Sequence, residues 1–169
     1  DLDKANTFFP RSGFIPRFTL HGCTRFAVKL DFLAGVLLKA MEAVGSQDQR
    51  SAQVQVGEVL AWRHTFWGLT EAMTKTPDPW VNGAVQPNTE YGMAYRVLAT
   101  TAYPRIKEII EQTISSGLIY LNSHAVDFKT PELRPYLDKY LRGSNDYDAI
   151  ERVKLLKILW DAVGTEFGG

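Results

Sequence analysis

Two short glycine-containing segments carry residue types that suit phosphate chemistry. One is Arg142-Gly143-Ser144-Asn145, and the other is Ser116-Gly117-Leu118. Each is expected where a helix ends or the next one begins, so that backbone amides lack helical partners and a glycine lets a ligand approach the main chain. The guanidinium of Arg142 adds a permanent cation beside the first segment. The pattern therefore suits a phosphate or pyrophosphate that contacts bare amides.

A purely structural interpretation of the same residues stays open. Gly143 can simply end one helix, and Asn145 or Asp148 can cap the next one, as these residue types commonly do. The two interpretations differ in whether the amides of the segment face a ligand or bond within the chain.

The histidines and the single cysteine offer weaker signals. His64 and His124 could carry protons at a cofactor, although a packed or surface histidine is the simpler interpretation of each. The three histidines are widely separated and form no HxH or HxxxH pattern, so no metal is predicted. Cys23 is the only cysteine, which excludes an internal disulfide and fits a reducing compartment. We therefore expect a cytoplasmic protein.

Composition and charge exclude several classes of function. Of the 169 residues, 45% are hydrophobic and 22% are charged, which is ordinary for a globular chain. Nineteen basic residues balance nineteen acidic ones, so no net charge favours nucleic acid or an anionic membrane. The apolar stretch 26–44 is interrupted by Lys29, Asp31, Lys39 and Glu42, which predicts a buried helix and no membrane span.

The apolar periodicity predicts an all-α bundle of four main helices and one short helix. The first is expected over 16–45, the second opens at a Ser46–Gln49 capping box and stops at Pro77, and the third follows Asn88. Pro104 predicts a kink in the third helix near residues 100–101. The short helix is expected from Pro131 to Gly143, and the last from about Asp148, with Glu151 completing a capping box, to Phe167.

Residues 1–13 show no helical period, and no convincing strand is predicted beyond this opening segment. The chain opens without methionine and closes on two glycines, so we expect a piece of a longer protein.

Several long motifs in a fixed order carry a resemblance to one family. They lie at 26–32, 79–84, 95–99, 116–121, 140–145 and 160–169, and include Ala61-Trp62-Arg63-His64-Thr65-Phe66-Trp67. From about Arg17 onward the chain resembles the oxygenase component of two-component 4-hydroxyphenylacetate 3-monooxygenases. The resemblance implies an acyl-CoA dehydrogenase-like fold, in which residues 1–15 end the middle β-domain and its linker and residues 16–169 form the C-terminal helical bundle. It also implies a homotetramer, arranged as a dimer of dimers.

The resemblance further implies a flavoprotein that hydroxylates aromatic compounds. A separate flavin reductase would supply reduced FAD, which with O2 hydroxylates a phenol ortho to its hydroxyl and gives a catechol. The substrate would resemble 4-hydroxyphenylacetate or derive from tyrosine, either free or tethered to a carrier protein. The family's substrate-binding and catalytic residues lie mainly in other domains, so no catalytic residue is assigned here and this segment alone is expected to be inactive.

The same resemblance implies that both glycine segments contact the cofactor. The expected cofactor-binding residues are Ser116, Gly117, Leu118, Arg142, Gly143, Ser144 and Asn145. Many acyl-CoA dehydrogenases have a glutamate base at the position where this chain has Arg142, and a guanidinium cannot act as a base at neutral pH. An anion contact and a structural ion pair both stay open for Arg142.

Two other classes of function stay as alternatives. One is a CoA-ester dehydrogenase or dehydratase on the same scaffold, and the other is a helical oligomerisation module without its own ligand. The related 4-hydroxybutyryl-CoA dehydratase binds an iron-sulfur cluster through a cysteine in a comparable Gly-Cys setting. Here Gly22-Cys23 has no further cysteines, and one thiolate cannot hold a cluster, so a small buried thiol is the better interpretation.

Overall fold

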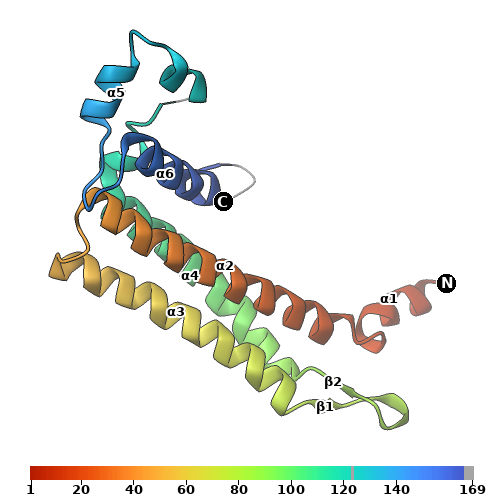
Figure 1. Ribbon diagram of the computed structural model, residues 1–169. Helices are drawn as coiled ribbons and strands as arrows, with labels where there is room; N and C mark the ends of the chain where they lie inside the picture. Colours follow the sequence, from red (N-terminus) through yellow and green to blue (C-terminus); the bar gives the residue numbers. More distant parts are fainter. Residues whose placement is uncertain (123, 166–169) are drawn as a thin grey trace. The chain divides into compact units, whose positions relative to one another are not determined.

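The computed structural model describes residues 1–122 and 124–165, and almost all of their regular structure is helical (Figure 1). The expected all-α bundle is confirmed. The chain forms two compact units, each assembled from separate stretches of sequence. The first unit holds residues 1–31 and 60–104, and the second holds residues 32–59 and 105–169.

The first unit contains α1, the N-terminal part of α2, the C-terminal part of α3 and the N-terminal part of α4. These helices span Leu2–Arg11, Phe14–Val44, Arg50–Lys75 and Thr89–Ile114. Side chains with no exposed surface from three of the helices, such as Leu30, Phe66 and Ala102, form its core. The ring of Phe66 contacts Phe26 and Tyr95 edge-on, so aromatic contacts add to the burial of apolar surface.

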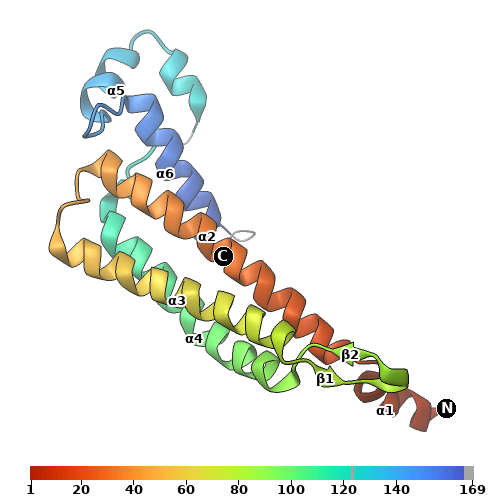
Figure 2. The same ribbon diagram turned by 60° about the horizontal axis from the view of Figure 1, so that its bottom comes forward.

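A short hairpin joins α3 to α4 within the first unit (Figure 1, Figure 2). Strand β1, Asp78–Pro79, pairs antiparallel with β2, Val85–Gln86, and the 3₁₀ turn η1, Val81–Gly83, connects them. Asn82 and Gly83 both have positive φ, at 55° and 75°, which is the backbone that tight hairpin turns require. The sequence predicted turn formers here but no strand, so that expectation is wrong for four residues.

Residues 2–11 form helix α1, so the expectation that the opening segment lacks a helix is wrong. Asp1 caps this helix, because its side chain accepts from the amides of Asp3 and Lys4. None of its residues is buried, although Phe8 and Phe9 make edge-on ring contacts with each other and with Phe14. Local capping thus supports the helix where the pattern gave no apolar stripe to detect.

The second unit contains the remaining halves of α2, α3 and α4, followed by the C-terminal elements. After α4 come the 3₁₀ helices η2, Ser115–Leu118, and η3, Ala125–Lys129, then α5, Arg134–Tyr140, and α6, Ala149–Val163. The fully buried Leu37, Ile109 and Leu156 belong to α2, α4 and α6. Arg105 of α4 donates to both carboxylate oxygens of Glu58 on α3, at 2.8 and 2.9 Å.

The predicted capping residues can be compared with the hydrogen bonds at the start of each helix. Asn88 accepts from the amides of Glu90 and Tyr91 at the start of α4, and Asp148 forms the predicted capping box with Glu151 at the start of α6. The capping box at Ser46 is wrong: α3 begins at Arg50, and the hydroxyl of Ser46 is buried without a hydrogen-bond partner among the described residues.

Other helices also test the sequence prediction. Helix α5 begins at Arg134 and not at Pro131, and η3 precedes it as a 3₁₀ helix that is not among the five helices predicted from the sequence. Helix α4 runs through Pro104 without a break in its helical assignment. Helix α6 ends at Val163, and the predicted continuation to Phe167 extends beyond the described residues.

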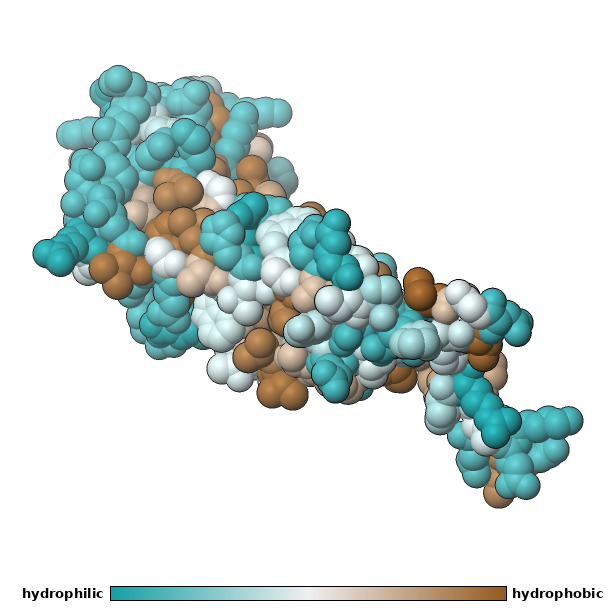
Figure 3. All heavy atoms as spheres, turned by 90° about the horizontal axis from the view of Figure 1, so that it is seen from below, coloured by the Kyte–Doolittle hydropathy of each residue, from teal (hydrophilic) through white to brown (hydrophobic). Residues whose placement is uncertain are grey.

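No helix among the described residues is long and apolar enough to cross a membrane. Apolar side chains nevertheless reach the surface of both units, as the brown areas of Figure 3 show.

Candidate functional site

The first predicted segment, residues 116–118, lies in η2 immediately after α4. Ser115 begins η2 with a φ of 51°, which turns the chain sharply out of the helix. The carbonyl of Ser116 accepts from the amides of Ile119 and Tyr120, at 3.0 and 2.9 Å. The side chain of Leu118 is buried, whereas Ser116 is exposed. The segment therefore presents Ser116 to solvent and anchors itself through Leu118.

Gly117 lies where α2, α4 and α6 come close together. A Cβ added there would lie 3.2 Å from Cγ2 of Ile114, and 3.8 Å from both Cδ1 of Leu156 and Cγ1 of Val44. These distances leave little room for a larger side chain. The glycine thus permits close packing of the segment.

The second predicted segment, residues 142–145, connects α5 to α6 and bonds to the C-terminal end of α2. The amide of Gly143 donates to the carbonyl of Tyr147 at 3.0 Å, and the amide of Ser144 donates to the carbonyl of Ala43 at 2.9 Å. The side-chain amide of Asn145 donates to the carbonyl of Glu42 at 2.8 Å. The expectation of bare amides is therefore wrong for Gly143 and Ser144, because both amides bond within the chain.

These hydrogen bonds provide partners for carbonyl groups at the C-terminal end of α2. The last carbonyls of a helix have no partner inside the helix and need one elsewhere. Residues 142–145 supply a partner for the carbonyl of Ala43 and a second one for the carbonyl of Glu42, which also accepts from the amide of Gly45 at 3.2 Å. The segment therefore acts as a C-terminal cap that comes from a distant part of the sequence.

Two glycines allow this close approach. A Cβ added at Gly143 would lie 2.7 Å from Cβ of Tyr147 and 2.8 Å from the carbonyl oxygen of Ala43. Gly45 has a φ of 78°, and a Cβ there would lie 2.5 Å from the hydroxyl oxygen of Ser144. Neither position accepts a side chain without movement of the backbone or of a short side chain.

Both predicted segments therefore meet the same end of α2. Gly117 lies beside Val44, and Gly143 and Ser144 lie beside Ala43, all within the second unit. Sequence reasoning missed the role of residues 42–45 in holding the two segments together. Gly45 signals the end of a helix, but nothing local to it indicates which distant segments bind there.

Charges around the second segment are mixed. Arg142 lines a polar hollow of about 300 Å³ with Arg134, Asp138, Asp146 and Asp148. Arg134 donates to the carboxylate of Asp138 at 2.7 Å, and this hydrogen bond raises the pKa of Arg134. Among the described residues, no carboxylate lies within ion-pair distance of Arg142, which is exposed. The geometry therefore gives no support to the structural ion pair and leaves the guanidinium accessible to an anion.

Glu42 further connects α2 to the segment after α5. Its carboxylate accepts from Nζ of Lys39 at 2.8 Å and from the hydroxyl of Tyr147 at 3.1 Å. These hydrogen bonds, first that of Lys39 and then that of Tyr147, lower the pKa of Glu42. The carboxylate therefore stays ionised and fixed to the segment at neutral pH.

The remaining candidates lie elsewhere. His64 is exposed on α3 in the first unit, and His124 is exposed at the start of η3, where its Nδ1 accepts from the amide of Val126 at 3.1 Å. Cys23 is buried, donates to the carbonyl of Phe66 and accepts from the hydroxyl of Thr70. Burial raises the pKa of the Cys23 thiol. Within the described ranges, no three histidine, cysteine or acidic side chains are grouped as metal ligands.

The chain is thus a helical bundle in which both glycine segments meet the C-terminal end of α2. The family described as "4-hydroxyphenylacetate 3-hydroxylase C terminal" matches residues 5–169, and the chain belongs to this family. Membership confirms the resemblance that the motifs indicated.

Two curated relatives and one solved structure show the extent of the similarity. The chain is 62% identical over 169 residues to a "4-nitrophenol 2-monooxygenase, oxygenase component" from Rhodococcus sp, covering 100% of this chain and 33% of the relative. It is 53% identical over 169 residues to a "(3S)-3-amino-3-(3-chloro-4-hydroxyphenyl)propanoyl-[peptidyl-carrier protein SgcC2] monooxygenase" from Streptomyces globisporus, covering 100% of this chain and 32% of the relative.

The solved structure is the oxygenase component of a 4-hydroxyphenylacetate 3-monooxygenase complexed with FAD. It superposes with a TM-score of 0.91 at 27% identity, covering 99% of this chain and 35% of that one. The chain thus spans about a third of the length of the curated relatives it matches.

Proposed function

We propose that this chain is the C-terminal helical part of the oxygenase component of a two-component flavin-dependent monooxygenase. The observation that carries this proposal is the family match over residues 5–169. In the proposed reaction, reduced FAD from a separate flavin reductase and O2 hydroxylate a phenol ortho to its hydroxyl. One oxygen atom enters the ring to give a catechol, and the other leaves as water while the flavin is oxidised.

The seven predicted cofactor residues fall into two roles in this proposal. Arg142 and Ser116 are exposed and available for direct contact with FAD, Arg142 through its cation and Ser116 through its hydroxyl. The other five fix the shape of the two segments, since their backbone or side chains bond or pack within the chain; they are Gly117, Leu118, Gly143, Ser144 and Asn145. The chain therefore supplies one wall of the flavin site, and FAD supplies the redox chemistry when bound.

The substrate in this proposal is a phenol, either free and similar to 4-hydroxyphenylacetate or derived from tyrosine and tethered to a carrier protein. The names of two relatives support both forms. We assign no catalytic residue within this chain. Arg142 disfavours the CoA-ester dehydrogenase alternative, because a guanidinium cannot remove a substrate proton.

We also propose a cytoplasmic homotetramer, arranged as a dimer of dimers, in which residues 16–169 form the helical domain and residues 1–15 link it to the preceding β-domain. Trp160 of α6 supports the assembly, because 38% of the surface of this large apolar residue is exposed in the single chain. The reduced, buried thiol of Cys23 fits the cytoplasm.

The test is an anaerobic titration of the full-length protein with reduced FAD, followed by mixing with O2 and a panel of phenols. Catechol formation is measured by chromatography with and without the reductase. Arg142→Ala should weaken reduced-FAD binding by about tenfold, the value of one hydrogen bond to a charged group. The matched control is Arg50→Ala, which removes an exposed arginine at the start of α3, outside both segments.

The proposal is supported if one phenol gives a catechol and only the Arg142 variant loses affinity. A folded protein that binds no reduced FAD would overturn the oxygenase interpretation and leave the oligomerisation module. Equal affinities of both arginine variants and the unaltered protein would remove Arg142 from the flavin wall.

A further inference from the structure

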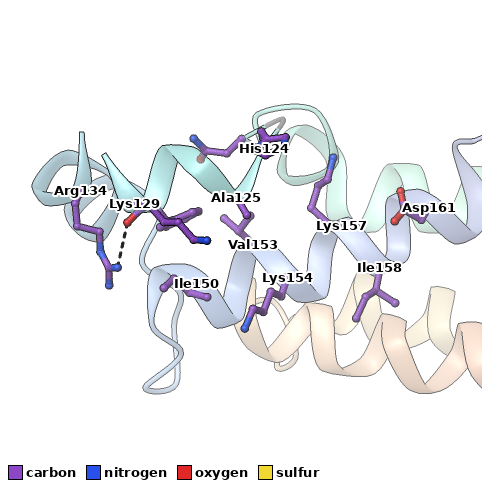
Figure 4. A pocket seen from close by; sticks show the side chains of 12 residues that line it. His124, Ala125, Lys129, Arg134, Ile150, Val153, Lys154, Lys157, Ile158 and Asp161 are labelled. Carbon is purple, nitrogen blue, oxygen red and sulfur yellow. Dashed lines mark hydrogen bonds between the residues drawn. The ribbon is translucent and has the colours of Figure 1, made fainter. Parts of the chain in front are cut away.

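A hollow of about 540 Å³ lies within the second unit, between the stretch that contains η3 and one face of α6 (Figure 4). Helix α6 contributes residues that recur at spacings of three and four, which places them along one face of a helix: Ile150, Val153, Lys154, Lys157, Ile158 and Asp161. None of the residues of the two proposed flavin-wall segments, 116–118 and 142–145, lines this hollow.

The inner surface of the hollow is apolar. Val153 is 6% exposed, Phe128 and Ile150 are half-buried, and Ala125 and Ile158 complete the lining. The volume lies within the range of pockets that bind small organic molecules, roughly 300–1,000 Å³. The ring of Phe128 and the branched side chains of α6 offer the kind of surface on which another planar ring packs well. The body of a fitting ligand is therefore apolar and flat.

The rim of the hollow is cationic. Lys129, Lys154 and Lys157 line it, and Asp161 is the single acidic residue of the lining. A fourth cation, Arg134, is already bonded to Asp138 outside the hollow. Three lysines against one aspartate leave a net charge of two positive in the hollow, whereas the whole chain has a formal net charge of zero. This local excess complements an anion.

The charges are unevenly distributed along the hollow. Figure 4 shows Lys129 and Arg134 toward one end and Asp161 toward the other, with Val153 and Lys157 between them. An anionic group placed beside Asp161 would be repelled, so the anionic end of a ligand belongs near Lys129 and Lys154.

We propose that this hollow is a binding site for a planar aromatic molecule that carries one anionic group. The ring packs on Phe128, Val153 and Ile158, and the anionic group lies among the lysines. Two sources share this chemistry, namely an aromatic carboxylate and a nucleotide, and competition experiments distinguish them.

The test uses 1-anilinonaphthalene-8-sulfonate, an aromatic sulfonate whose fluorescence rises on binding, titrated into the purified protein. Lys129→Glu combined with Lys154→Glu should raise its Kd by about tenfold, and Ala125→Trp should reduce binding by filling the hollow. The control is Lys139→Glu, which reverses one charge on α5 outside the hollow and should leave the Kd unchanged. Circular dichroism confirms that each variant is folded.

Competition then identifies the ligand class. Displacement of the probe by 4-hydroxyphenylacetate supports an aromatic carboxylate, and displacement by AMP supports a nucleotide. The proposal is overturned if neither displaces the probe, if inorganic phosphate displaces it as well as either aromatic anion, or if the control variant loses as much affinity as the double lysine variant. The proposal is also overturned if Ala125→Trp, which fills the hollow, binds the probe as tightly as the unaltered protein does.

Discussion

Replacement of Gly143 by alanine should separate the segment 142–145 from the end of α2. The added Cβ would lie 2.8 Å from the carbonyl oxygen of Ala43 and 2.7 Å from Cβ of Tyr147. Neither atom can rotate away, because one is backbone and the other is the first atom of its side chain. Forced expansion of such a contact costs about 1–3 kcal/mol. The hydrogen bonds from the amides of Gly143 and Ser144 would also weaken, and each contributes about 0.5–1.5 kcal/mol.

We therefore expect Gly143→Ala to lower the free energy of unfolding by about 2–4 kcal/mol. The matched control is Gly57→Ala in the same unit, where no atom lies within 4 Å of the added Cβ. Gly57 is an exposed position inside α3, and alanine there should raise the free energy of unfolding by about 0.5–1 kcal/mol. The same substitution thus has opposite signs at the two glycines.

The assay is urea unfolding followed by far-ultraviolet circular dichroism, with the slope against urea compared between variants. An unfolding midpoint for Gly143→Ala at or above that of the unaltered protein, with an unchanged slope, would refute the reasoning. Such a result would mean that loss of the hydrogen bonds between residues 142–145 and α2 does not lower the free energy of unfolding. A second readout is the affinity for reduced FAD, which should fall together with stability if the cap also positions Arg142.

Three further predictions concern single residues. Asp78 accepts from the hydroxyl and the amide of Thr89, at 2.7 and 2.8 Å, and these hydrogen bonds lower its pKa. The contribution of Asp78 to stability is therefore present at neutral pH and is lost as the pH falls through the lowered pKa, so the urea midpoints of Asp78→Asn and the unaltered protein should converge in acid. Midpoints that stay equally separated at every pH would contradict this assignment. Cys23 should react with a thiol reagent at least about tenfold more slowly in the folded protein than in urea, because it is buried and its pKa is raised; equal rates would show that the site opens readily. Leu156→Ala should lower the free energy of unfolding by about 2–5 kcal/mol, measured by urea unfolding, because the side chain is fully buried; a loss below about 1 kcal/mol would place it outside the core.

Much of the secondary structure was predictable because it depends on neighbours in the sequence. Apolar residues at spacings of three and four indicate a helix, and Asn88, Asp148 and Glu151 provide caps within three residues of the helix starts. The prediction failed where the local signal was absent or ambiguous. Helix α1 has no buried face, and the hairpin at 78–86 contains only two-residue strands.

The candidate site was predictable in part. Both glycine segments could be singled out, because glycine beside polar residues at a helix boundary has a restricted set of physical meanings. The partners of their amides could not be predicted. The side chain of Asn145 bonds to a carbonyl 103 residues earlier in the chain, and no local pattern encodes that pairing.

The sequence by itself therefore determined the helical class, several helix boundaries, the family motifs and the two segments. Only the tertiary structure decided that the amides of Gly143 and Ser144 bond within the chain, that both segments meet residues 42–45, and that one face of α6 lines a cationic hollow. The physical reason is the separation along the sequence over which each interaction acts. Helix formation and capping act over about four residues, whereas each of these outcomes requires segments far apart in the sequence to pack together.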